Sequence, residues 1–264
     1  MNIFIREMKA HKKALIIWGI CIIFMIISGM AKYTSVYSGN SMNELVKQMP
    51  KSLQAIMGNG ALDLSKASGY YGMLFLYLVL MATIHASMLG ADIISKEERD
   101  KTFEFLMVKP VSREKIITSK LLAAFVNIVI FNIINFVFSI ILVSYYAKGE
   151  SIVGNIAILM AGMFILQLIF LFIGTAIAAI SSNPKTATSL STGILLVTFM
   201  LSILIDMNEK LNILKYLTPF KYYEAKNLMY GGGLDPIFLI LSFAIIGILF
   251  WVTYKFYEKR DLKV

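Results

Sequence analysis

Six long apolar runs, separated by shorter polar stretches, constrain this chain more than any other feature of its sequence. The runs cover residues 14–31, 70–91, 121–146, 152–180, 186–205 and 236–254. A helix needs about 20 apolar residues to cross the hydrocarbon core of a bilayer, and in that core only helices and closed barrels satisfy every backbone polar group. The sequence therefore predicts an all-α fold, a polytopic bundle of six transmembrane helices that forms a single domain over residues 1–264.

Composition and charge exclude several other classes of protein. Only 16% of the residues are charged, whereas about a quarter are charged in a typical soluble domain. The single cysteine, Cys21, cannot form a disulfide within the chain, and the two histidines, His11 and His85, are too few and too far apart for a metal site. The net charge of +9 comes from bases that flank the apolar runs, which is typical of membrane topology and not of nucleic-acid binding.

The distribution of lysine and arginine predicts how the chain is oriented. If the six runs are spans, one side of the membrane receives residues 1–13, 92–120, 181–186 and 255–264. These four segments contain sixteen of the 25 Lys and Arg residues. Because cytoplasmic loops carry an excess of these bases, we expect this side, with both termini, to be cytoplasmic.

Residues 1–13 are basic and amphipathic, with Ile3, Phe4 and Met8 on one face. Such a segment is typical of a helix that lies in the plane of the membrane interface, but it is equally compatible with a basic flank of the first span. The run over 14–31 is too long for a signal peptide and lacks a cleavage site after it, so we expect it to be retained.

The segment over residues 92–120 carries a concentrated set of charges between the second and third runs. A charge at the centre of a bilayer costs about 2.5–3.5 kcal/mol even on lenient scales, so this segment should lie in water. Residues 94–108 can form a helix whose apolar face carries Phe103, Leu106 and Met107. A solvated loop does not need such a face, which favours a surface that docks into another protein.

Two residues of this segment predict where its first helix ends and where its second helix begins. Pro110 should end the first helix at or before Lys109. Ser112 is placed to cap a second helix, which should begin near Arg113 and continue into the third span.

The residues of this segment follow a recognisable order: two acids, a Thr-x-Glu step, a Pro, a Ser-Arg pair and a Lys that opens the third run. They are Glu97, Glu98, Thr102, Glu104, Pro110, Ser112, Arg113 and Lys120. This order resembles the corresponding part of type-2 ABC exporter permeases, although Lys101 stands where that family usually has Gly. The resemblance covers nearly the whole chain, including the amphipathic N-terminus, a Pro-x-x-Leu at 50–53 and the segment over 216–220.

The resemblance implies a transport subunit and not an enzyme. Such a permease binds no cofactor itself, in agreement with the absence of a G-x-x-x-x-G-K-[ST] motif from the sequence. ATP and magnesium would be bound by a separate cytoplasmic ABC ATPase subunit, and two permease chains, as a homodimer or a related heterodimer, would work with two ATPases in a bacterial cell membrane. The implied ATPase-coupling residues are Glu97, Glu98, Thr102, Phe103, Glu104, Leu106, Met107 and Arg113, with the turn over 181–185 as a second contact.

Polar residues within the runs are predicted to face the bundle interior, because buried amides in lipid need partners. They are Asn127, Asn132, Asn135 and Gln167. Hydrogen bonds between helices are favoured over a substrate path as their role, and packing is favoured over a proton relay for His85. In the resembled family the second and fifth spans line the path, which makes the possible path residues Met81, His85, Met88, Thr192, Phe199 and Met200. Small residues over 188–193 predict a close helix contact, within the chain or across a dimer.

Two other classes of function compete with the transporter hypothesis. An intramembrane protease of the Glu-Glu-x-x-x-Arg type would need Arg where Thr102 stands, and more than one histidine in the spans. A membrane sensor or immunity protein that binds a toxic peptide without ATP stays open. The short outer loops and the apolar, Met-rich path favour export of an amphipathic or hydrophobic cargo, such as a membrane-active peptide, a drug or a lipid, over an ion or a polymer.

Overall fold

The computed structural model describes residues 3–33, 48, 50, 62–100, 112–147, 152–181 and 183–259. Its long helices are α1 (Ile3–Lys32), α4 (Ala67–Arg99), α6 (Arg113–Tyr146), α7 (Val153–Ile180), α8 (Pro184–Met207) and α10 (Pro236–Lys259). All 6 are long and apolar enough to cross a membrane. The chain between α8 and α10 forms η2 (Glu209–Leu217), η3 (Pro219–Lys221) and α9 (Ala225–Tyr230). The all-α bundle is confirmed, and no strand occurs in the described ranges.

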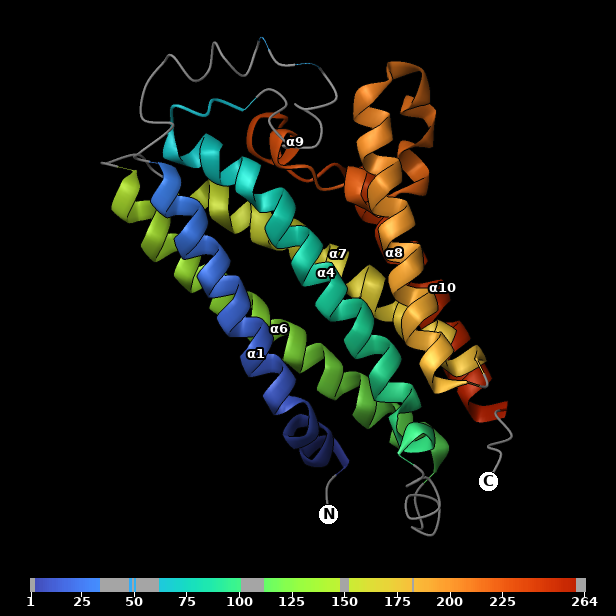
Figure 1. Cartoon of the computed structure of the whole chain (residues 1–264). Helices are drawn as coiled ribbons and strands as arrows, with labels where there is room; N and C mark the ends of the chain where they lie inside the picture. The colour runs from blue at the N-terminus through green and yellow to red at the C-terminus, as the bar shows by residue number, and fades with distance from the viewer. Residues whose placement is uncertain are drawn as a thin grey trace.

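Helix α4 lies at the centre of the bundle and packs most extensively against α7. Helices α1 and α6 lie side by side on one flank, while α8 and α10 form the other flank (Figure 1). The beginning of α1, the end of α10 and the adjacent ends of α4 and α6 lie at one end of the bundle, which we call the terminal end (Figure 1). Helix α9 lies at the opposite end.

Two glycines allow the close approach of α4 and α7. A Cβ atom on Gly90 would overlap the Leu171 carbonyl oxygen, and one on Gly174 would overlap the Ser87 carbonyl oxygen. Small residues are favoured at such contacts, because helices in lipid associate through tight packing and not through exclusion of water. By contrast, a Cβ on Gly193 of α8 would meet no atom within 4 Å. At Gly193 the predicted small face of α8 therefore makes no such close contact among the described residues, and its role across a dimer stays a prediction.

The helices extend beyond the predicted spans at the terminal end. α1 continues without interruption through the basic segment and the first run, and Figure 1 shows its first turns bent away from the rest. α4 continues to Arg99 instead of ending near residue 91. α6 begins at Arg113, and the predicted cap is present, since Ser112 Oγ accepts a hydrogen bond from the Lys115 amide at 3.3 Å.

The substitution Gly174→Ala should lower the free energy of unfolding by about 1–3 kcal/mol, because the added methyl group would push α7 off the backbone of α4. Gly193→Ala is the matched control and should not destabilise the protein, since its methyl group would enter open space. Thermal unfolding of the two purified variants measures the difference. Equal stability of the two would contradict the close packing of α4 on α7.

Candidate functional site

Buried charges join α1, α4 and α6 at the terminal end of the bundle. Glu97 of α4 is 5% exposed and Lys120 of α6 is fully buried. Lys120 donates to Glu97 Oε2 and to the Ile93 carbonyl oxygen. Arg6 of α1 donates to the other oxygen, Glu97 Oε1, at 2.9 Å. A single carboxylate therefore connects all three helices.

A second carboxylate from α1 lies beside this pair. Glu7 is fully buried and its Oε1 accepts a hydrogen bond from Arg6 at 2.9 Å. Its Oε2 lies 3.9 Å from Lys96 Nζ and 3.8 Å from His11 Nε2, and it makes no hydrogen bond among the described residues. Buried charges are costly unless they are paired, so the charges of α1 and α4 must stay in register.

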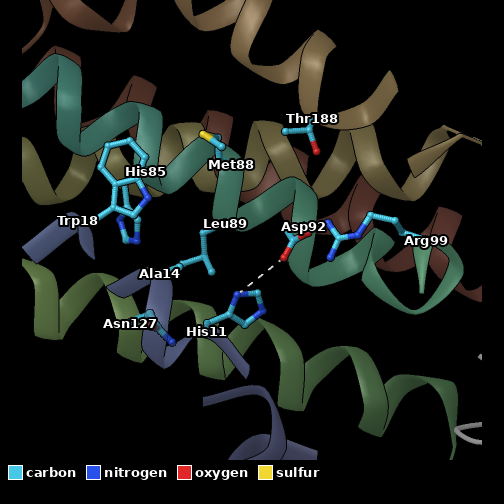
Figure 2. A pocket seen from close by; sticks show the side chains of 10 residues that line it. All are labelled: His11, Ala14, Trp18, His85, Met88, Leu89, Asp92, Arg99, Asn127 and Thr188. Carbon is cyan, nitrogen blue, oxygen red and sulfur yellow. Dashed lines mark hydrogen bonds and ion pairs between the residues drawn. The ribbon is translucent and has the colours of Figure 1, made fainter. Parts of the chain in front are cut away.

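We call this cluster the ionic junction. Its members are Arg6, Glu7, His11, Asp92, Lys96, Glu97 and Lys120. His11 Nδ1 lies 3.8 Å from Asp92 Oδ2, as the dashed line in Figure 2 shows, and Asp92 also pairs with Arg99. The junction lies at the terminal end of the bundle, near the end of α4 and the beginning of α6. In the sequence, residues 101–111 connect these two helices.

The predicted coupling residues fall into two groups. Glu97, Glu98 and Arg113 are described: Glu97 points into the ionic junction, Glu98 is half-buried, and Arg113 donates to the Glu258 carbonyl oxygen of α10 at 2.7 Å. The others, Thr102, Phe103, Glu104, Leu106 and Met107, lie outside the described residues. The prediction that the whole charged segment over 92–120 lies in water is wrong for Glu97 and Lys120. Both side chains are buried, and each neutralises the charge of the other.

The amides in the spans face the bundle interior, as the sequence predicts. Asn132 donates to Gln167 Oε1, and Gln167 Nε2 donates to the Ala82 carbonyl oxygen at 3.2 Å. At a separate position Tyr71 donates to Ser139 Oγ at 2.6 Å. These bonds connect α4, α6 and α7, so the interhelical role of the amides is supported.

A cavity of about 190 Å³ adjoins the ionic junction, between α1, α4, α6 and α8 (Figure 2). Its lining residues are His11, Ala14, Trp18, His85, Met88, Leu89, Asp92, Arg99, Asn127 and Thr188. His85 is 3% exposed, and its ring stacks on Phe131 with centroids 4.8 Å apart. Packing therefore accounts for the position of this ring.

Only two of the predicted path residues, His85 and Met88, line this cavity. Thr188 of α8 also lines it, one turn before Thr192. Phe199 is buried against Phe220, with centroids 5.2 Å apart, and Met200 is 51% exposed. Met81 and Thr192 are half-buried.

Sequence analysis missed the contribution of α1 to the site. Arg6, Glu7 and His11 were assigned only to a basic flank or an interfacial helix. The sequence signal that could have revealed this contribution is Glu7, the one acid among the first thirteen residues. A single acid within a basic segment indicates a specific partner. The partners of Glu7 are far away in sequence, so they could not be identified from spacing.

A second cluster of charges lies at the opposite end of the bundle. Lys221 is 6% exposed and pairs with Asp206 and Glu224, and Lys226 pairs with the same two carboxylates. Burial alone would lower the pKa of Lys226, but these carboxylates outweigh burial and raise that pKa above its ordinary value. The cluster therefore holds the chain after α8 against the end of that helix. Among the described residues, no group of His, Cys, Asp and Glu side chains could hold a metal ion.

Comparison with known proteins adds one finding. The family model described as ABC-2 family transporter protein matches residues 1–262, which is nearly the full length of the 264-residue chain. No curated protein matches the chain.

Glu97→Gln should destabilise the protein by about 3–5 kcal/mol, because it removes the carboxylate that is paired with the buried Lys120. Lys120→Met should cost a similar amount, since Glu97 would then keep only Arg6. The double variant Glu97→Gln, Lys120→Met should be more stable than the sum of the single effects predicts, because it removes both buried charges. Thermal unfolding of the four proteins gives the coupling energy. Lys115→Met, at an exposed position of α6, is the control; additive effects would contradict the buried pair.

Proposed function

This chain belongs to the ABC-2 family of transporter proteins, and we propose that it is the permease subunit of an ATP-driven exporter of amphipathic or hydrophobic cargo. The family places it among the membrane components of ABC transporters. The observation that carries the proposal is the family match over residues 1–262 on a bundle with six helices that can cross a membrane.

The segment over 101–111 is proposed to dock into a cytoplasmic ABC ATPase. It joins α4 to α6 at the terminal end, the end that the basic residues predict to be cytoplasmic. Phe103, Leu106 and Met107 would fill a cleft in the ATPase. Because Glu97 and Lys120 connect the two helices on either side of the segment, a displacement of the segment would be transmitted to α4 and α6 together.

The transport path is proposed to run along α4 and α8, and to be completed by a second permease chain. His85 and Met88 of α4 and Thr188 of α8 already line one cavity. Large apolar side chains of α8 point away from the rest of the chain, including Val197 at 68% exposure and Met200 at 51%. In a membrane such a face meets either lipid or a helix of a second chain. A path lined by these apolar side chains favours amphipathic or hydrophobic cargo.

The test is purification of the tagged chain from the membranes of its own cells. An ABC ATPase should copurify, and the complex should hydrolyse ATP in a vanadate-sensitive reaction that amphipathic compounds stimulate. Recovery of the chain without any ATPase would contradict the proposal and would favour a sensor or immunity protein that works without ATP.

The double variant Phe103→Ala, Leu106→Ala should reduce the amount of copurified ATPase about tenfold or more, since apolar anchors dominate docking interfaces. The matched control is Ile213→Ala, Leu217→Ala, which removes exposed apolar side chains from η2 at the opposite end. This control should insert into the membrane and retain the ATPase. Equal ATPase recovery with both variants would contradict docking by the segment over 101–111.

A further inference from the structure

The cavity beside the ionic junction has a polar floor and an apolar mouth. His11, His85 and Asn127 are at most 6% exposed and form the polar part of the floor, which also includes Leu89 at 6% exposure. Ala14 and Met88 are exposed at the mouth, where Thr188 of α8 also lies. This gradient matches an amphipath that enters with its head toward the floor.

Two polar atoms of the floor have no hydrogen-bond partner among the described residues. They are His11 Nε2 and His85 Nδ1, and both are buried. Buried polar groups in folded proteins are nearly always hydrogen-bonded. Because both histidines line the cavity, a ligand head could supply the missing partner for the His85 ring.

The charged side chains of the lining neutralise each other. Asp92 and Arg99 form an ion pair, and Arg99 bonds also to Asp100 at 3.1 Å. A charged head would compete with this ion pair, an anion with Asp92 for the Arg99 guanidinium and a cation with Arg99 for the Asp92 carboxylate. Among the described lining residues, the cavity therefore offers hydrogen bonds and apolar contacts, and its Asp and its Arg are already paired with each other.

The volume limits what part of a ligand can enter. The cavity of about 190 Å³ has room for several waters, since one water needs about 10–15 Å³ of such space. This is enough for a small polar head but not for a whole drug or peptide. The tail would leave between Ala14 and Met88 and lie along the exposed apolar surface of the bundle.

We propose that this cavity binds the uncharged, hydroxyl- or amide-bearing head of an amphipath through a hydrogen bond to His85, and that the Asp92–Arg99 pair disfavours cationic and anionic heads. This site adds a class of ligand to the proposed transport function. Only the role of the amphipath as cargo rests on that function. A resident membrane lipid with the same head would use the same contacts.

The test uses the full-length chain in phospholipid nanodiscs and reads the fluorescence of Trp18. The chain has two tryptophans, and the other, Trp251, is 57% exposed on α10, so Trp251→Phe leaves Trp18 as the only reporter. Three probes share a brominated dodecyl tail that quenches tryptophan: a monoacylglycerol, a trimethylammonium and a sulfate. The monoacylglycerol should quench Trp18 saturably, in competition with its unbrominated form, and bind at least about threefold more tightly than either charged probe.

Two His85 variants distinguish a loss of ligand binding from a loss of folding. His85→Phe retains a ring that can stack on Phe131 but removes both nitrogens, and should weaken monoacylglycerol binding about threefold to tenfold. His85→Gln restores a donor and an acceptor and should recover most of the affinity. Equal or tighter binding of a charged probe, or unchanged affinity in His85→Phe with an unchanged unfolding temperature, would overturn the proposal. If both variants fail to fold, the comparison of the three probes on the Trp251→Phe chain still decides it.

The copurified ATPase complex distinguishes this proposal from the function on which it rests. If the ATPase copurifies but the trimethylammonium quenches Trp18 as tightly as the monoacylglycerol or more tightly, the head selection is refuted and the transporter is left intact. Selective monoacylglycerol binding to a chain that recruits no ATPase would refute the transporter and leave the site intact. Selective binding together with ATP-driven movement of the probe across proteoliposomes identifies cargo, and the same binding without movement identifies a resident lipid; both support the site.

Discussion

The Glu97 carboxylate is the interaction on which the terminal end of the bundle depends. It lies 5% exposed within a largely apolar protein, where an unpaired charge would be several kcal/mol unstable. Arg6 of α1 and Lys120 of α6 each hold one of its oxygens. Three helices that are distant in sequence are therefore fixed to one another at the point where α4 ends and the segment over 101–111 begins.

In an ABC-2 transporter, the position of the ionic junction bears on how a movement would pass from one helix to another. If an ATPase moves the segment over 101–111, neither α4 nor α6 can move alone without separating Lys120 from Glu97. The links from α1 are of two kinds, since Arg6 bonds directly to Glu97 whereas His11 and Lys96 face their carboxylate partners at 3.8–3.9 Å. Of the longer pairs, His11 and Asp92 line the cavity, so a change in the junction would alter the cavity wall where these two residues meet.

The sequence predicted the six helices and the interior amides well, because hydropathy and length determine which segments cross a bilayer. It also predicted the cap at Ser112, which depends only on residues nearby in the chain. It placed Glu97 on a solvated surface, because the neutralising partners Arg6 and Lys120 are brought to it only by tertiary packing. The close contact of Gly90 with α7 was missed for the same reason, since a glycine in an apolar run shows its partner only in three dimensions.

In the proposed function the segment over 101–111 docks into an ATPase, and the partner of this segment can be identified directly. A photoreactive amino acid in place of Phe103, activated by light in living cells, would crosslink to whatever contacts this position. The account predicts a crosslink to a cytoplasmic protein that contains an ATP-binding cassette. Labelling of the same position by a membrane-impermeant reagent from outside the cell, or crosslinks to lipid alone, would contradict it.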